Sequence, residues 1–311
     1  MKDLISSLVF YQLGNGSCEI GQNDLFSIGF WILVVLIFRF ICSQILTPFI
    51  VKNFAKRQSP KFEETFFLSV HYILAFFFGY LVLHDKYWFR LLYMAWKDRK
   101  GLWEHDGDPF PCDVKIYYAF QLGFYIVDLP FAFFKQKQPY LILAHHITTI
   151  TLIGTSWYYL HYQIGTLLMI LHDISDVFLY SAQAFNYLGY STMKTACFVP
   201  FVLTFFFFRL IILPFLDYSE LIEYKGRTGF VGDVLTGGLP ILVLIFMHIY
   251  WFFLILRIIY RMFVAEKPVF DIRSDDEDDE VKDDKKNNDK NTPPVQTAKP
   301  KEENSDIKKR K

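Results

Sequence analysis

Five ionisable side chains stand close together in the stretch HHITTITLIGTSWYYLHYQIGTLLMILHDISDVFLYSAQAFNY, which covers residues 145–187. They are His145, His146, His172, Asp173 and Asp176. The rest of the stretch is mostly apolar and long enough for two membrane-spanning helices. Ionisable side chains in hydrocarbon cost roughly 2.5–3.5 kcal/mol or more each, so they usually face the interior of a helix bundle and mark a functional site. We therefore expect these two helices to form the active region.

Helical spacing assigns the residues of the first helix to different faces, because residues three and four apart share a face. From His145 the face continues through Thr149, Leu152 and Ser156, and it is polar. From His146 the face continues through mostly apolar residues. We therefore expect His145 to face a cavity and His146 to face apolar surroundings.

The second helix has a polar face of its own. It is formed by Asp173, Asp176, Tyr180 and Gln183, with His172 at its edge. Two such faces on consecutive antiparallel helices can meet across a buried pocket. Arg209, in the next apolar stretch, would be a counter-charge for the carboxylates.

A histidine oriented by an aspartate suits a general base or, with an activated acyl donor, a nucleophile. We expect Asp176 to orient the imidazole of His145. The set of two histidines and two aspartates could also bind zinc or iron. The sequence lacks the HxxH-type clusters of membrane hydroxylases and desaturases, so it favours acyl-type transfer and predicts no metal. A third interpretation treats the five residues as polar contacts between helices without a chemical role.

The rest of the chain must position these two helices. Of its 311 residues 53% are hydrophobic, and they fall in blocks of membrane-spanning length. The blocks predict spans at about 25–46, 66–84, 116–134, 139–160, 163–188, 196–216 and 236–263. We therefore predict an all-α fold, a polytopic membrane helix bundle with about seven transmembrane helices. Its environment is the lipid bilayer, and no nucleic-acid partner is expected.

Basic residues orient the bundle. Lysines and arginines follow the first and third spans, at 52–61 and 135–137, and the positive-inside rule makes those loops cytosolic. The N-terminus is then lumenal and the C-terminus cytosolic. The segment 85–115 opposes this orientation, because it would be lumenal yet holds six Lys or Arg. The sequon at Asn15 agrees with a lumenal N-terminus and is a candidate glycosylation site.

The chain divides into three parts. Residues 1–60 hold the lumenal N-terminus, the first span and a cytosolic loop, residues 61–264 form the membrane domain, and residues 265–311 form a cytosolic tail. The tail has 12 Lys or Arg, 14 Asp or Glu and almost no aromatic residues, so it is predicted to be disordered. Within it, Ser274 precedes acidic residues and is a candidate phosphorylation site, and the terminal lysines match a dilysine signal for retrieval to the endoplasmic reticulum.

The four cysteines, at positions 18, 42, 112 and 197, show no metal-binding spacing. A bridge between Cys18 and Cys112 is an option if both face an oxidising lumen. We expect unpaired thiols instead.

The central stretch resembles the Lag1 motif of ceramide synthases, members of the TLC (TRAM, Lag1 and CLN8) domain family. The matching residues are His145, His146, Thr149, Leu152, Ser156, Gly165, His172, Asp173 and Asp176. Segments 61–67, 207–215, 247–262 and 273–280 are similar in order and spacing, so the likeness covers most of residues 60–280. The chain departs from the family at Gln163, where an Arg is common, and at Tyr180 and Gln183, where Glu and Lys are common.

The resemblance implies an acyltransferase of the endoplasmic reticulum membrane that moves a fatty acyl group from acyl-CoA to the amine of a sphingoid base, sphinganine or sphingosine. It implies no cofactor beyond the acyl-CoA co-substrate, and a homo- or heterodimer. The expected catalytic residues are His145, His146, Asp173 and Asp176, with His172, Thr149, Ser156 and Arg209 in support. The competing class is a non-enzymatic family member that senses lipid or associates with the translocon.

An amine is mostly protonated at neutral pH, since its reference pKa is ~10, and so it needs a base before it attacks a thioester. Either His145 takes that proton directly, or it first accepts the acyl group as an acyl-imidazole, which we favour. Asp173 and His172 would hold the ammonium group or relay protons.

Overall fold

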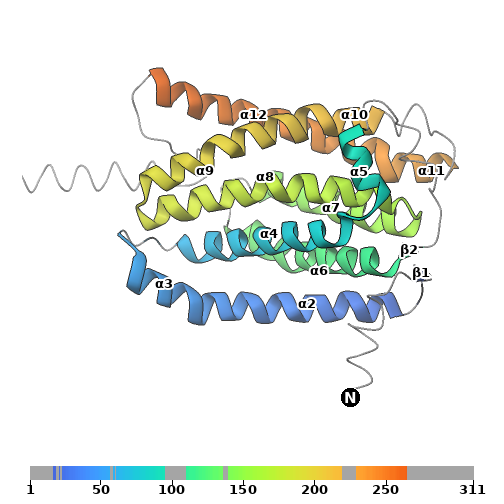
Figure 1. Cartoon of the computed structure of the whole chain (residues 1–311), viewed down its shortest axis with the longest axis horizontal. Coiled ribbons are helices and arrows are strands. Elements are labelled where there is room, and N and C mark those ends of the chain that lie inside the picture. The colour runs from blue at the N-terminus through green and yellow to red at the C-terminus, as the bar shows by residue number, and fades with distance from the viewer. Residues whose placement is uncertain are drawn as a thin grey trace, which may run out of the picture.

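The computed structural model describes residues 17–18, 21, 23–56, 59, 61–94, 110–135, 139–218 and 229–264. Within these ranges the chain forms a bundle of long helices (Figure 1), so the predicted all-α class is confirmed. The strands there are β1 (Ser17–Cys18) and β2 (Phe110–Pro111), which form one short antiparallel pair. Asn15, Ser274 and the 265–311 tail lie outside the described residues.

Six helical stretches among the described residues are long and apolar enough to cross a membrane. They are built from α2 (Asn23–Ile41), η2 (Cys42–Leu46) and α3 (Thr47–Phe54); α4 (Phe62–Leu83); α6 (Cys112–Lys135); α8 (Tyr162–Leu188); α9 (Ser191–Thr204), η4 (Phe205–Ile212) and α10 (Leu213–Tyr218); and η6 (Val234–Gly238) with α12 (Leu239–Val264). The segments η2, η4 and η6 are π-helical. Two short helices, α5 (Tyr87–Met94) and α11 (Gly229–Asp233), also lie among the described residues.

The predicted span at 139–160 is the helix α7 (Pro139–Tyr158), which is 20 residues long. It has the length of a span, but it is not among the six stretches that are apolar enough to cross a membrane. The count of about seven spans is therefore approximate.

The two helices of the candidate site lie in the middle of the bundle. In Figure 1, α2 lies on one side of α7 and α8, and α9 and α12 lie on the other. α4 and α9 pack along α8, whereas α6 and α12 pack along α7. The start of α2 and the end of α12 lie at opposite ends of the bundle (Figure 1).

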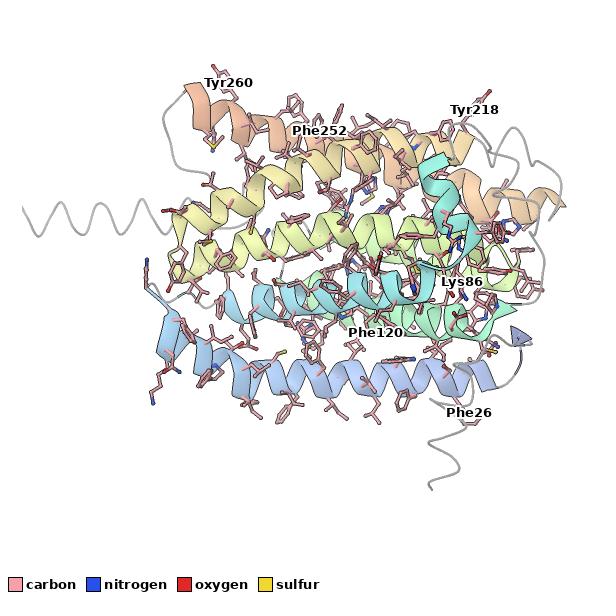
Figure 2. The ribbon with its side chains drawn as sticks, in the orientation of Figure 1. Phe26, Lys86, Phe120, Tyr218, Phe252 and Tyr260 are labelled. Carbon is pink, nitrogen blue, oxygen red and sulfur yellow. The ribbon has the colours of Figure 1, made fainter. Side chains whose placement is uncertain are left out.

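Apolar side chains cover the outside of the bundle as well as its inside. Phe26 is 70% exposed and Tyr260 is 63% exposed, and both point away from the helices in Figure 2. Phe120, by contrast, is 8% exposed and lies between helices (Figure 2). Helices satisfy their own backbone hydrogen bonds, so an apolar exterior is what a lipid environment requires.

Polar contacts tie the elements together at the β1–β2 end. Lys86 pairs with Asp113 at 2.6 Å, and Lys115 pairs with Asp24 at 2.5 Å. Trp88 Nε1 donates to Thr166 Oγ1 at 3.2 Å. These contacts connect the residue before α5 with α6, α5 with α8, and α6 with α2.

One expectation about the cysteines is wrong. Cys112 is disulfide-bonded, whereas Cys42 and Cys197 are free thiols. The alternative bridge between Cys18 and Cys112 agrees with the strand register, which places the backbone of Cys18 opposite Phe110. Sequence spacing alone could not show this, because the two segments meet only through the pairing of β1 with β2.

Candidate active site

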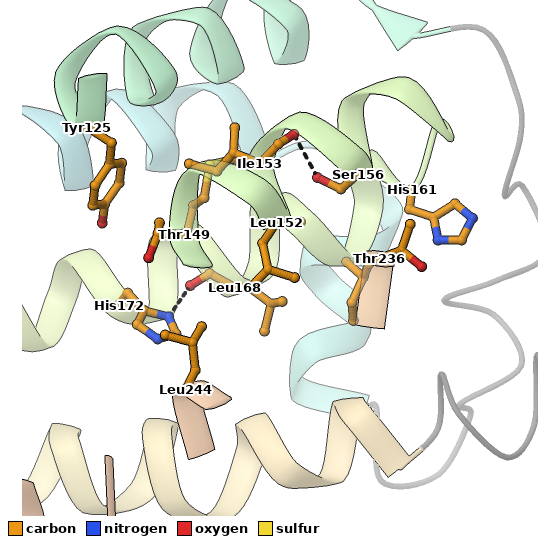
Figure 3. Close-up of a pocket in the computed structure, with 13 residues that line it drawn as sticks. Tyr125, Thr149, Leu152, Ile153, Ser156, His161, Leu168, His172, Thr236 and Leu244 are labelled. Carbon is orange, nitrogen blue, oxygen red and sulfur yellow. Dashed lines mark hydrogen bonds between the residues drawn. The ribbon is translucent and has the colours of Figure 1, made fainter. Parts of the chain in front are cut away.

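An apolar pocket lies between α7 and α8. Thr149, Leu152 and Ser156 of the predicted α7 face line it, and so does His172, but His145 does not; of the predicted α8 face, the lining includes none of Asp173, Asp176, Tyr180 and Gln183. The pocket encloses about 580 Å³ of empty space, part of which is open to the outside. Its lining consists of Tyr125, Thr149, Leu152, Ile153, Ser156, His161, Ile164, Gly165, Leu168, Met169, His172, Thr236 and Leu244. Figure 3 shows His172 at one end of the pocket and His161 at the other.

The motif residues Ser156 and Gly165 meet near the His161 end of this pocket. A Cβ atom at Gly165 would overlap Tyr118 Oη and lie 2.9 Å from Ser156 Oγ. Those two oxygens lie 3.1 Å apart and share a hydrogen bond. The glycine is therefore needed because the hydroxyl groups occupy the space of its side chain.

His146 is held in a buried ion network. Its Nε2 lies 3.0 Å from Asp128 Oδ2, and its Nδ1 lies 3.0 Å from the carbonyl oxygen of Ile142. Arg39 donates to Asp128 Oδ1 at 3.1 Å and also pairs with Glu64. The expectation that His146 faces apolar surroundings is wrong, because α6 supplies a carboxylate that the α7 sequence cannot reveal. With both ring nitrogens engaged, His146 is suited to positioning α7.

His145 has no such partners. Its Nδ1 is buried and makes no hydrogen bond to a described residue. Its ring meets that of Trp251 edge to face, with centroids 5.4 Å apart. One helical turn on, Thr149 lines the pocket, and its buried hydroxyl is also unpaired. A buried imidazole nitrogen without a partner is available as a base or nucleophile.

The two aspartates of the motif face different helices. Asp173 Oδ2 accepts hydrogen bonds from Tyr117 Oη at 3.1 Å and from Gln121 Nε2 at 2.6 Å, both on α6. Asp176 pairs with Arg209 at 2.7 Å, which confirms the predicted counter-charge.

The expected contact between Asp176 and His145 is absent among the described residues. Asp176 instead points toward η4, where the guanidinium of Arg209 draws its carboxylate. The two residues lie on different helices, and helical spacing within each does not determine which neighbour a side chain meets.

Arg209 also connects α8 to η4, a π-helical segment of the kind often found at functional sites. Its Nη2 donates to the carbonyl oxygen of His172 at 3.0 Å. The ring of His172 donates from Nδ1 to the carbonyl oxygen of Leu168 at 2.7 Å, shown as a dashed line in Figure 3. Nε2 of His172 is left buried without a described partner. In the neutral ring this nitrogen carries the free lone pair.

The departures from the family pattern lie outside the pocket lining. Gln163 is 3% exposed, and neither atom of its side-chain amide is hydrogen-bonded to a described residue. Tyr180 stacks on Tyr72 with ring centroids 5.2 Å apart. An aromatic pair therefore occupies the place where a charged Glu is common.

Sequence reasoning missed several polar partners of the motif. They are Arg39, Glu64, Tyr117, Gln121, Asp128 and His248. A signal was present for three of them, because Arg39, Asp128 and His248 each lie inside a predicted span. The rule that singles out ionisable residues in hydrocarbon applies to them as well. Among the described side chains, no three His, Cys, Asp or Glu are grouped so that they could hold a metal ion.

Comparison with known proteins gives one consistent family. The TLC domain matches residues 61–257 of this chain. Ceramide synthase LOH2 of Arabidopsis thaliana is 28% identical over 275 residues, which cover 81% of this chain and 90% of the plant protein. Human ceramide synthase 3 is 32% identical over 222 residues, which cover 70% of this chain and 56% of the human protein. The similarity to ceramide synthase hyl-1 of Caenorhabditis elegans is 30% identity over 237 residues, 70% of this chain and 61% of the worm protein.

Proposed function

The chain belongs to the TLC domain family, and from that premise we propose that it is a ceramide synthase, an acyltransferase that joins a fatty acyl group from acyl-CoA to the amine of a sphingoid base. The chain spans nine-tenths of the plant relative but little more than half of the human one. The observation that carries the proposal is an apolar pocket lined by His172, whose Nε2 is unpaired, and by Thr149, which lies one helical turn from His145. The Nδ1 atom of His145 is also buried and unpaired among the described residues.

In the proposed reaction the acyl chain lies in the pocket. Its apolar tail extends past Leu168 and Leu152 toward Ser156, and the thioester carbonyl lies at the His172 end. A ring nitrogen of His145 attacks the carbonyl carbon, a C–N bond forms and the C–S bond breaks. The thiolate of CoA takes the proton that the imidazole loses. The products of this step are CoA and an acyl-imidazole.

The amine then attacks the acyl-imidazole. Its nitrogen forms the amide bond, the bond from the acyl carbon to His145 breaks, and the released imidazole takes up a proton. This two-step route separates a difficult transfer into two easier displacements. Pairing through Asp128 holds the α7 backbone near His145, and the Asp173 and Asp176 contacts hold α8, so the two helices keep the reacting groups in place.

We place the enzyme in the endoplasmic reticulum membrane, with the start of α2 on the lumenal side and the end of α12 on the cytosolic side. The disulfide at Cys112 supports this orientation, because disulfides persist in an oxidising compartment. The His145 end of α7 would then open toward the cytosol, where CoA is bound and released. The co-substrate is acyl-CoA, and we propose no further cofactor.

A reconstituted assay tests the proposal. The purified protein is incubated in lipid nanodiscs with sphinganine and a panel of acyl-CoAs, and products are measured by mass spectrometry. We expect one ceramide and one free CoA per turnover, and acyl-CoA alone should leave a mass increase of one acyl group on the peptide that carries His145. No ceramide from any acyl-CoA would overturn the proposed function. Turnover without the adduct would favour direct attack of the amine on the thioester.

A further inference from the structure

Unpaired polar atoms gather beyond the His172 end of the pocket, and two of the side chains that hold them come from α12. His248 is 0% exposed, and neither of its ring nitrogens is hydrogen-bonded to a described residue. Trp251 is 4% exposed, and its Nε1 is likewise unpaired. The two residues are three positions apart and so share a face of the helix. Leu244, one turn before His248, lines the pocket.

The rings of His248 and Trp251 lie between His172 on α8 and His145 on α7. The centroids of His172 and His248 are 5.1 Å apart, those of His248 and Trp251 are 5.9 Å apart, and those of Trp251 and His145 are 5.4 Å apart. α12 therefore places two rings between His172 on α8 and His145 on α7. The sequence of the motif gives no sign of this third helix.

Burial without a hydrogen bond is uncommon for polar side chains and calls for an explanation, such as a ligand that completes the site. The buried unpaired atoms of this region are His145 Nδ1, Thr149 Oγ1, His172 Nε2, Arg209 Nε, both ring nitrogens of His248 and Trp251 Nε1. They come from α7, α8, η4 and α12; Thr149 and His172 line the apolar pocket itself, and the ring of His248 meets that of His172. A ligand with a long apolar chain and a reactive polar head fits this distribution.

The ring of His248 differs from that of His172 in one respect. His172 commits Nδ1 to the carbonyl oxygen of Leu168. His248 commits neither nitrogen. A neutral imidazole has one nitrogen that carries a proton and one that accepts, so His248 can take a proton on one side and release one from the other. The titratable or charged groups that interact with it are Arg209, His172 and His145.

Resting on the proposed ceramide synthase activity, we propose that His248 is the base that deprotonates the sphingoid ammonium group before the amine attacks. The ammonium gives one proton to the free nitrogen of His248 and becomes the neutral amine. The amine nitrogen bonds to the acyl carbon, the bond from that carbon to His145 breaks, and the second proton passes to the departing imidazole. His248 then releases its proton to water, so the net products are the amide, neutral His145 and one proton.

The test separates the two steps of the reaction in the full-length protein. His248→Leu removes both nitrogens at similar volume, and His248→Gln is the second variant if the first does not fold. His71→Leu is the matched control, because His71 is 1% exposed, has an unpaired Nε2 and stacks on Phe124 at 3.5 Å, away from the pocket lining. Rapid quenching measures CoA release with palmitoyl-CoA alone and then ceramide formation after sphinganine is added.

We expect the His248 variants to release CoA and form the acyl adduct at the wild-type rate, while ceramide formation slows about 100-fold or more, the usual effect of losing a general base. The remaining rate should rise about tenfold per pH unit up to pH ~9, because only amine that is already neutral reacts. The thermal midpoint should stay the same or rise, since the ring of His248 makes no hydrogen bond to a described residue.

Two outcomes would overturn the assignment of His248. One is ceramide formation within a few-fold of wild type, and the other is an equal slowing of both steps, which a merely structural role would produce. If the wild-type protein released no CoA and formed no ceramide, the proposed function itself would fail, and this result is distinct from either of the other two. His71→Leu should change neither step.

Discussion

Two buried polar clusters lie on the helices of the candidate site, and they differ in how fully their hydrogen bonds are satisfied. The first joins Glu64, Arg39, Asp128 and His146 into a continuous ion network. The second contains His145 together with His172, His248 and Trp251, and each of these four side chains has at least one buried nitrogen without a described partner. Adjacent residues of one helix, His145 and His146, belong to different clusters.

This difference distinguishes the residues that hold the helices in position from the residues that are available to react with a substrate. A buried charge that is fully paired resists rearrangement, and removing one partner leaves the other uncompensated. A buried nitrogen without a partner has its lone pair or its proton available to a substrate. The satisfied cluster therefore anchors α7 to α2, α4 and α6, and the unsatisfied cluster is where a reaction can occur.

The largest expected effect comes from His145→Ala. Ceramide formation should fall by at least about 10²–10⁴-fold, because a nucleophile or base at the reacting carbonyl is lost. The thermal midpoint in detergent should change little, since Nδ1 of His145 makes no hydrogen bond to a described residue. Mass spectrometry of the product and a thermal scan of the same sample check both parts. Substantial retained turnover would contradict the assignment of chemistry to the unsatisfied cluster.

Asp128→Ala should instead act on stability. It leaves Arg39 and His146 buried without their shared carboxylate, and breaking a buried pair costs about 3–5 kcal/mol. The free energy of unfolding in mixed micelles measures the loss. Asp85→Ala is the control, because the Asp85 side chain is 56% exposed and its pair with Lys86 should contribute less than about 1 kcal/mol. If Asp128→Ala kept its stability and lost only turnover, the satisfied cluster would belong to the chemistry.

Leu168→Phe tests whether the acyl chain runs from the unsatisfied cluster into the pocket. Leu168 lines the pocket one helical turn from His172, so a larger ring should block long chains and leave short chains able to bind. We expect the ratio of kcat/KM for long and short acyl-CoAs to fall about 10- to 100-fold, as a change of one or more methylene groups in an apolar pocket does. Leu168→Met, of similar volume, should leave the ratio near that of wild type. An unchanged ratio for Leu168→Phe would place the acyl chain elsewhere.

Asp176→Asn should have the smallest effect of the four. The amide oxygen can still accept a hydrogen bond from Arg209, but the charge of the pair at 2.7 Å is lost. We expect kcat to fall about tenfold with KM nearly unchanged, equivalent to about 1.4 kcal/mol. Steady-state kinetics with sphinganine and one acyl-CoA measure kcat and KM separately. An increase in KM alone would mean that the ion pair contributes to binding of the ground state instead.

The fold class and part of the candidate site could be predicted from the sequence. Blocks of apolar residues determine that the fold is a membrane helix bundle, because no other structure satisfies backbone hydrogen bonds in lipid. The polar face that continues from His145 through Thr149 and Leu152 to Ser156 predicts a cavity beside this helix, and the last three of these residues line the pocket of the structure. These features depend on composition and on the periodicity of a single helix, which are local properties of the chain.

The tertiary structure decided which side chains meet. Helical periodicity determines which residues share a face, but the neighbour that a face contacts depends on how distant segments pack. For this reason the sequence could not give the pairing of His146 with Asp128 or the placement of Asp173 against α6. The disulfide at Cys112 and the approach of His248 to His172 have the same physical origin, since residues far apart in the chain become neighbours only when the helices pack together.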